Sequence, residues 1–224
     1  MRTVRTGLVF MTLLTVVAIG QTASAGGIFD AFRGERGSGV YATEQRDAKG
    51  FDRVKVNGST DVLIEIGDKV AVEVTADDNL LDNVITRVHG RTLEIRTRGS
   101  YRDAEIEVHI TVPHLTAVAI SGSGDVEVRD VKEDFFEIEI SGSGDIDISG
   151  EVDEVDISVE GSGDVNARRL KAREARARVD GSGDIDVFAR EFCRGTVNGS
   201  GDIDIYGDPK ISRRVHGSGD ISRR

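Results

Sequence analysis

The chain has 224 residues, of which 29 are Lys or Arg and 40 are Asp or Glu, so its formal net charge is −11. This acidic balance argues against a nucleic-acid partner, because binding to phosphates needs clustered positive charge. The single cysteine, Cys193, excludes an internal disulfide, so stability has to come from packing. With 27 Gly, two Pro and no Trp, the composition indicates many tight turns around a core of Val and Ile.

The segment from Met1 to Ala25 is typical of a secretory signal peptide. Arg2 and Arg5 form a basic start, an apolar run follows from Gly7 to Gly20, and Ala23-Ser24-Ala25 is a small-residue cleavage site. The apolar run is shorter than the roughly 20 residues that span a bilayer as a helix, so a membrane anchor is the weaker interpretation. We expect an exported protein located in the periplasm, on the outer surface or outside the cell.

After the leader, we expect a lead-in segment at residues 26–49 and one domain at residues 50–224. Loss of the leader removes two Arg and takes the formal charge to −13, from 27 basic and 40 acidic residues. No later run is apolar enough to cross a bilayer, so we expect no transmembrane span in the mature chain. The mature length suits a single domain.

The domain begins with a weak copy of a turn that recurs later, Asn57-Gly58-Ser59-Thr60-Asp61. Strand-like runs follow at residues 70–75, 93–96 and 105–112. The next copy of the turn ends at Asp125, about three periods of the later repeat after Asp61. We therefore expect the whole mature chain to form one repeat array, in which three early coils have lost the turn sequence.

The second half of the chain repeats the turn Ser-Gly-Ser-Gly-Asp, or its shorter form Gly-Ser-Gly-Asp, with a nearly constant period. These turns end at Asp125, Asp145, Asp164, Asp184, Asp202 and Asp220. Their glycines, which we expect to be structural, are Gly122, Gly124, Gly142, Gly144, Gly161, Gly163, Gly181, Gly183, Gly199, Gly201, Gly217 and Gly219. A fixed period indicates a solenoid, in which each coil buries its apolar side chains against its neighbours.

Two apolar columns flank the turn when the copies are aligned on their Asp. Five residues before the Asp stand Ile120, Ile140, Val159, Val179, Val197 and Val215. One residue after it stand Val126, Ile146, Val165, Ile185, Ile203 and Ile221. Because alternate side chains of a strand point to opposite faces, both columns are expected to point inward.

These columns predict an all-β fold, a right-handed parallel β-helix or β-solenoid of stacked 18–20-residue coils. An antiparallel sandwich or barrel also has strands at regular spacing, but it explains the same turn at every corner less well. One segment, Leu170–Val179, has the composition of a helix. The repeat register instead predicts a strand with Ala175 and Ala177 inward, in which outward Arg176 pairs with Asp156 across adjacent strands.

The repeated Ser-Gly-Ser-Gly-Asp-Ile turns, entered through Phe51-Asp-Arg-Val-Lys-Val-Asn-Gly58, resemble those of the putative auto-transporter adhesin, head GIN domain family. The resemblance covers about Gly50 to Asp220 and rests on the number and order of the repeats. It implies an exported bacterial domain with a β-helical solenoid fold and a role in adhesion.

The repeat Asp side chains are the leading candidates for chemistry. Stacking would place them about 4.8 Å apart, where like charges repel. Ca²⁺ would relieve this repulsion, because it binds carboxylates and turn carbonyls. The candidate ligands are Asp125, Asp145, Asp164, Asp184 and Asp202. A second polar ladder two residues further on comprises Glu127, Asp147, Asn166, Asp186 and Asp204.

A structural role is the stronger interpretation of the repeat Asp residues, because an Asp beside glycines commonly accepts hydrogen bonds from turn N–H groups. Calcium-binding nonapeptide repeats also have a different period. Acid–base catalysis by pairs such as Asp145 with Asp147, or Asp202 with Asp204, is disfavoured. A catalytic pair needs two differently tuned environments, whereas these acids recur coil after coil. We therefore predict no enzyme activity and no cofactor apart from the Ca²⁺ considered above.

The remaining reactive side chains fit a structural interpretation. The histidines, His89, His109, His114 and His216, lack the spacing of metal ligands and are expected at the surface. Cys193 shares a column with Phe136, Val155, Ala175 and Ile211 and is expected in the core. A basic cluster at the C-terminal end, Arg213, Arg214, Arg223 and Arg224, is expected to be solvated, the alternative being contact with an anionic lipid, polysaccharide or acidic partner.

These observations predict a noncatalytic exported protein of the cell envelope or surface, an adhesin or binding module. Its repeated polar ladders would face carbohydrate, a protein partner or another copy of itself. The alternatives are a calcium-binding structural solenoid and, less favoured, a carbohydrate-active β-helix enzyme.

Overall fold

The computed structural model describes residues 34–224, so the predicted signal peptide and the first part of the lead-in segment lie outside the described residues. Apart from a short 3₁₀ helix at Leu81–Asn83, every regular element in the described part is a strand. None of its helical segments is long and apolar enough to cross a membrane.

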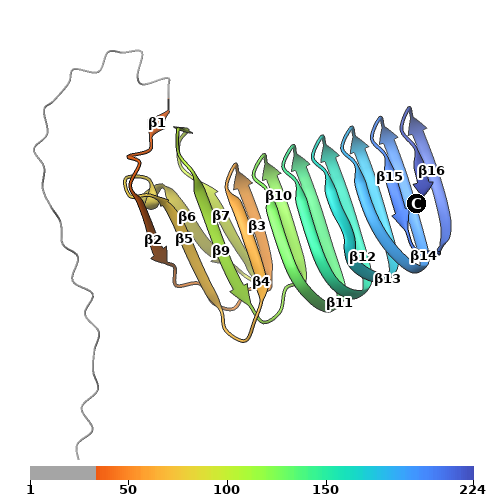
Figure 1. Cartoon of the computed structure of the whole chain (residues 1–224), viewed down its shortest axis with the longest axis horizontal. Coiled ribbons are helices and arrows are strands. Elements are labelled where there is room, and N and C mark those ends of the chain that lie inside the picture. Colours follow the sequence, from red (N-terminus) through yellow and green to blue (C-terminus); the bar gives the residue numbers. More distant parts are fainter. Residues whose placement is uncertain (1–33) are drawn as a thin grey trace, which may run out of the picture. The chain divides into compact units, whose positions relative to one another are not determined.

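Four long curved strands form the central coils (Figure 1). They are β11 (Val126–Gly142), β12 (Ile146–Gly161), β13 (Val165–Gly181) and β14 (Ile185–Gly199). Each pairs in parallel with the next, and equivalent repeat positions lie side by side, as Ile140 does with Val159. The final coils consist of β15 (Ile203–Tyr206), β16 (Lys210–Gly217) and β17 (Ile221–Arg223). The predicted parallel β-solenoid is therefore confirmed.

The N-terminal part of the solenoid contains shorter strands. They are β1 (Glu35–Arg36), β2 (Tyr41–Gln45), β3 (Arg53–Gly58), β4 (Asp61–Ile66), β5 (Ala71–Asp77), β6 (Val84–His89), β7 (Thr92–Thr97), β8 (Tyr101–Arg102), β9 (Ile106–Val112) and β10 (Ala117–Gly122). β1 and β8 form a separate two-stranded sheet, and the other strands belong to the sheet of the coils.

The first copy of the turn stacks directly on the second, although Asp61 and Asp125 are far apart in the sequence. β3 and β4 pair in parallel with β10 and β11, so Gly58 lies beside Gly122. On their other side, β3 and β4 pair in parallel with β7 and β9. The expectation of three decayed coils is therefore wrong, because the intervening chain supplies one parallel coil, β7 with β9, and an end cap.

The end cap is antiparallel. β5 runs antiparallel to β9, β6 runs antiparallel to β7, and β2 runs antiparallel to β5. Alternating apolar residues occur in parallel and antiparallel strands alike. The run at 70–75 was therefore correctly predicted as a strand, but its sequence does not show that it reverses direction.

The core lies between the two faces of the coils. Both predicted apolar columns are buried, with side chains no more than 2% exposed, apart from Val215. Val215 is 39% exposed because β16 pairs with β14 on one side and with no strand on the other in the described chain. Val215 keeps the inward register of its partner Val197, but at the end of the stack no further coil covers it. Each fully buried Val or Ile stabilises the fold by about 1.5–3 kcal/mol.

The segment with helical composition is a strand, as predicted. Within β13, Ala175 and Ala177 are buried. Arg176 lies opposite Asp156 on the adjacent strand, as predicted, but the direct hydrogen bond of its Nη1 goes to Oε2 of Glu154 at 3.3 Å. Glu154 is a diagonal neighbour on the same face, which a long guanidinium side chain reaches.

Candidate functional site

The glycines of the turn allow the coils to stack closely. The amide of Ser143 donates to the carbonyl of Gly122 at 2.9 Å, and equivalent bonds recur from coil to coil. Gly142, at φ +143°, adopts a backbone conformation that favours glycine. A Cβ on Gly144 would overlap the carbonyl oxygen of Gly124. The same close approach to the preceding coil occurs at all twelve turn glycines named from the sequence.

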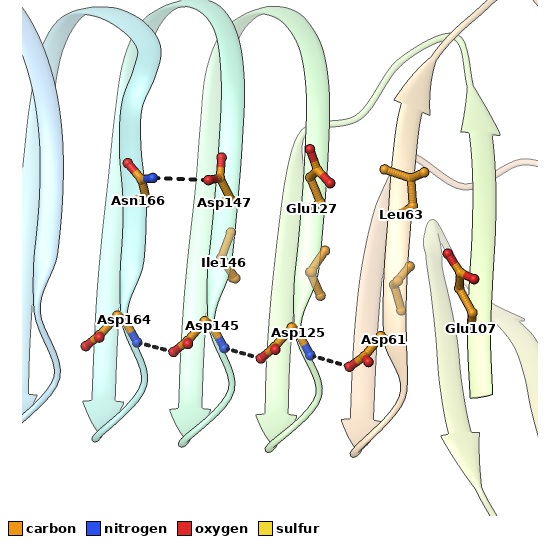
Figure 2. Close-up of a pocket in the computed structure, with 12 residues that line it drawn as sticks. Asp61, Leu63, Glu107, Asp125, Glu127, Asp145, Ile146, Asp147, Asp164 and Asn166 are labelled. Atoms are coloured by element: carbon orange, nitrogen blue, oxygen red, sulfur yellow. Dashed lines mark hydrogen bonds between the residues drawn. The ribbon is translucent and has the colours of Figure 1, made fainter. Parts of the chain in front are cut away.

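The carboxylate of each repeat Asp before the last one, Asp220, is hydrogen-bonded to the next coil. Oδ1 of Asp125 accepts the backbone N–H of Asp145 at 3.0 Å, and Oδ1 of Asp145 accepts that of Asp164 at 2.8 Å (Figure 2). The line begins at Asp61 and continues to Asp184, Asp202 and Asp220. These seven residues form the Asp ladder. The bonds along the ladder use Oδ1, which fixes the position of six of the seven carboxylates.

An open groove of about 570 Å³ lies along the N-terminal part of this ladder. Figure 2 shows two rows of side chains on neighbouring strands. The rows are Asp61, Asp125, Asp145 and Asp164, and Leu63, Glu127, Asp147 and Asn166. Glu107 of β9 adds a further carboxylate. We call the depression between these residues the acidic groove.

Arginines neutralise the second row more than the first. Arg129 Nε donates to Glu127 Oε1 at 2.8 Å, and this hydrogen bond lowers the pKa of Glu127. Arg169 Nη2 donates to Asp147 Oδ1 at 2.6 Å, and Asn166 Nδ2 donates to Asp147 Oδ2 at 3.1 Å. Within residues 34–224, no Arg or Lys forms an ion pair with the Asp ladder. The unneutralised charge of the groove therefore lies on the ladder and on Glu107.

The predicted metal ligands share one line but do not surround a point. Asp125, Asp145 and Asp164 line the groove, and Asp184 and Asp202 extend the ladder beyond it. In the part of the chain that the structure describes, no group of three His, Cys, Asp or Glu side chains could hold a metal ion. A calcium site gathers about six to eight oxygens around the ion. A row of carboxylates with one strand between neighbours has a different geometry.

The other predicted side chains lie where the register places them. His89, His114 and His216 are exposed, and His109 is half-buried with its Nε2 3.1 Å from Oε2 of Glu65. Cys193 is fully buried, and burial raises the pKa of its thiol to about 12. A thiol in this environment is a core group and has little nucleophilic character.

A second depression on the same face was not predicted. It has a volume of about 560 Å³, and we call it the basic-aromatic pocket. Its lining includes Arg168, Arg169, Lys171, Phe188 and Tyr206, with Asn166 shared with the acidic groove. Phe188 and Tyr206 each stand four residues after a repeat Asp, so an aligned aromatic column was the available signal.

The sequence of these coils matches a known family over residues 50–209, under the description "Putative auto-transporter adhesin, head GIN domain". The chain belongs to this family. The match begins just before β3 and ends before β16, so it includes the acidic groove and the basic-aromatic pocket of this head GIN domain. A comparison with curated proteins finds no match.

Solved structures share the fold of this head GIN domain chain. A putative adhesin from Bacteroides fragilis NCTC 9343 is 22% identical with a TM-score of 0.70, over 84% of this chain and 99% of that one. A putative lipid binding protein from Parabacteroides distasonis ATCC 8503 is 26% identical with a TM-score of 0.58, over 84% and 98%. A putative adhesin from the same organism is 25% identical with a TM-score of 0.55, over 85% and 99%.

Proposed function

We propose that this chain is a noncatalytic exported module of the cell envelope that binds a carbohydrate or protein partner in the acidic groove. Its family supports a role in adhesion, and the leader predicted from the sequence supports export. The observation that carries the proposal is the Asp ladder. Its carboxylates are held in place through Oδ1 and stand at the surface of an open groove.

The chemistry of the groove favours a partner with many hydrogen-bond donors. Ionised carboxylates only accept hydrogen bonds, and strand pairing repeats them about every 4.8 Å. Sugar hydroxyls and the ammonium or guanidinium groups of a protein are suitable donors. Because the carboxylates stand on paired strands, little ordering is needed when a partner binds. Leu63 adds an apolar contact within the second row.

The same geometry argues against two other functions. A general acid and a general base need environments that separate their pKa values, whereas the ladder repeats one environment in successive coils. One similar structure is described as a putative lipid binding protein. The carboxylates of the groove would repel anionic lipid headgroups, so a polar partner is the better fit here.

The proposal is tested by replacing two ladder carboxylates with amides. Asp125→Asn with Asp145→Asn keeps Oδ1 as an acceptor for the next coil but removes two charges from the groove. Purified chain, labelled with a fluorophore, is added to bacterial cells and to immobilised envelope polysaccharide. We expect the wild type to bind and the double variant to bind about thirtyfold more weakly, since replacing a charged acceptor with a neutral one weakens each hydrogen bond by about 1 kcal/mol.

The matched control is Glu139→Gln with Glu160→Gln. Both glutamates are exposed and stand on strands that enter the turns, outside the groove lining. This control is expected to bind like the wild type. Absence of wild-type binding to cells, envelope polysaccharide and envelope proteins would refute the proposal, as would unchanged binding of the groove variant.

A further inference from the structure

The basic-aromatic pocket lies where the length of the coils changes. The chain uses two residues more between Asp164 and Asp184 than between Asp184 and Asp202. The register shifts at two neighbouring places, because Ala167 and Ala172 of β13 lie beside Val187 and Ala189 of β14, and Glu174 then lies beside Phe192. Five residue steps in β13 first accompany two in β14, and two steps then accompany three, so β13 is two residues longer here and bulges outward. Bulges redirect side chains and are frequent beside binding sites.

The bulge places three basic residues beside the shorter coil that follows it. Arg168, Arg169 and Lys171 belong to it, and all three line the pocket. On the shorter coils, Phe188 lies beside Tyr206 on neighbouring strands. The pocket is thus a step in the solenoid surface with two adjacent aromatic rings and a basic rim.

The cations are held against the rings. The guanidinium carbon of Arg168 is 4.4 Å from the centre of the Tyr206 ring, and Nζ of Lys171 is 3.9 Å from the centre of the Phe188 ring. Such cation–π contacts orient a charge without neutralising it. A carboxylate can therefore still bind the outward side of each cation.

Carboxylates of the same chain pair with only part of this positive charge. Arg169 is paired with Asp147 at 2.6 Å, and Arg168 is only 4.0 Å from Asp186, at the limit of an ion pair. Lys171 Nζ donates to the carbonyl of Arg168 at 3.1 Å and has no ion pair in the described part of the chain. Lys171 is therefore the main free charge of the pocket.

The acidic groove restricts which anion fits, because Asn166 lines both depressions. A polyanion that lay along both would face the carboxylates of the Asp ladder. A ligand with neutral hydroxyl groups in the groove and one anionic group in the pocket avoids this repulsion. Sugar rings also stack on aromatic side chains, which suits Phe188 and Tyr206.

We infer that the basic-aromatic pocket binds a terminal carboxylated sugar of an oligosaccharide whose neutral part lies in the acidic groove. This inference rests on the proposed function and names its ligand class. The Lys171 ammonium and Arg168 guanidinium bind the sugar carboxylate, and the rings of Phe188 and Tyr206 contact the sugar ring.

The test uses an array of matched oligosaccharides. Each backbone is printed with a terminal glucuronic acid or N-acetylneuraminic acid, and also without that acidic sugar. A polyuronate and vesicles of anionic phospholipid are added as separate probes. We expect the wild type to prefer an acid-terminated member over its neutral match by about tenfold, and to bind the polyuronate and the vesicles more weakly.

The variant is Arg168→Ala with Lys171→Ala, and it is expected to lose the preference for the acidic terminus. Lys171→Arg keeps the charge and is expected to retain the preference. The matched control, Lys132→Ala with Arg194→Ala, removes one exposed Lys and one exposed Arg from outside the pocket lining and should behave like the wild type. Thermal melting of each variant checks folding.

Three results would overturn the inference. If oligosaccharides with and without the acidic terminus bind equally, and the double variant has no effect, the pocket does not bind the acidic sugar. The groove would then bind the neutral sugar alone. Stronger binding to polyuronate or to anionic vesicles than to the acid-terminated oligosaccharides would mean that Arg168 and Lys171 bind a different anionic ligand. Absence of binding to every sugar excludes the carbohydrate ligand, and the cell and envelope-protein binding assays then decide the proposed function separately.

Discussion

Asp145 has two separable roles at the scale of a single residue. Its Oδ1 accepts the N–H of Asp164 at 2.8 Å, while its charge belongs to the acidic groove. Asp145→Ala removes the acceptor and should lower the free energy of unfolding by about 1 kcal/mol. Asp145→Asn keeps an acceptor oxygen and should unfold like the wild type or at slightly higher urea. Equal losses in both variants, measured by urea denaturation, would contradict the ladder bond.

Asp156 is a carboxylate whose burial has a cost. Burial raises its pKa, nearby Arg176 lowers it, and Glu137 adds to the rise. A raised pKa in the folded state means that the folded chain binds the proton more tightly than the unfolded chain does. The contribution of Asp156 to stability is therefore greatest below its unfolded pKa of about 3.9. This contribution falls as the pH rises through the folded pKa. Asp156→Asn should therefore raise the melting temperature at pH 7.

The pH dependence gives the control for this substitution. At a pH below the unfolded pKa, Asp156 is protonated in both states, and the advantage of the Asn variant should disappear. Glu160→Gln, at an exposed position on the same strand, should show no comparable pH-dependent gain. An Asn variant that is less stable than the wild type at pH 7 would mean that the attraction to Arg176 outweighs burial.

Gly144 tests the need for close stacking of the turns. A Cβ at this position would overlap the Gly124 carbonyl oxygen, so Gly144→Ala should destabilise the chain by about 3 kcal/mol in chemical denaturation. Ser143→Ala, at an exposed turn position, is the control and should change stability little. Thr60 occupies the equivalent site of the first turn, which shows that a side chain is tolerated in that coil. An unchanged Gly144→Ala variant would refute the steric argument.

At the scale of the element, Cys193 reports on the opening of β14. Its side chain is fully buried and the pKa of its thiol is raised to about 12 by burial. At pH 8 nearly all of the buried thiol is therefore protonated, and only the thiolate attacks a disulfide reagent. The native chain should therefore react with such a reagent orders of magnitude more slowly than the urea-unfolded chain. Fast modification of the native chain would show that β14 opens locally.

The sequence predicts the coil elements well because each position is repeated in neighbouring coils. β13 shows this most clearly, since Ala175 and Ala177 would favour a helix in isolation. The columns formed with Val155 and Ile157 of β12 override that preference, and the structure has the predicted strand. Local propensity is weaker than a register that buries whole columns of side chains.

The end cap and the second depression could not be predicted in the same way. β5 and β9 have similar alternation, yet one is antiparallel to the coils and the other is parallel. The shortening of the coils after Asp184 is visible in the sequence, but the location of the bulge depends on which backbone pairs persist. A single sequence does not determine which backbone pairs form between β13 and β14, so the arrangement around Lys171 could be seen only in the structure.

At the scale of the whole molecule, stacking and charge oppose each other. The formal charge is −11, and the Asp ladder repeats a carboxylate on every coil from β3 with β4 onward. Like charges at strand spacing repel by about 1 kcal/mol per pair in water. The backbone N–H groups that bind Oδ1 and the arginines of the second row reduce this cost. The remaining repulsion should make the stability of the solenoid depend on salt.

This dependence separates general screening from a specific calcium site. We expect NaCl to raise the melting temperature, because added ions screen exposed charges within about 10 Å at 0.1 M. CaCl₂ and MgCl₂ at equal concentration should give the same further rise, since the ladder is a row of carboxylates and does not form a cage. Chelator added to freshly purified chain should then leave the melting temperature unchanged. A rise with Ca²⁺ alone, together with calcium found by elemental analysis, would instead support a calcium-binding structural solenoid.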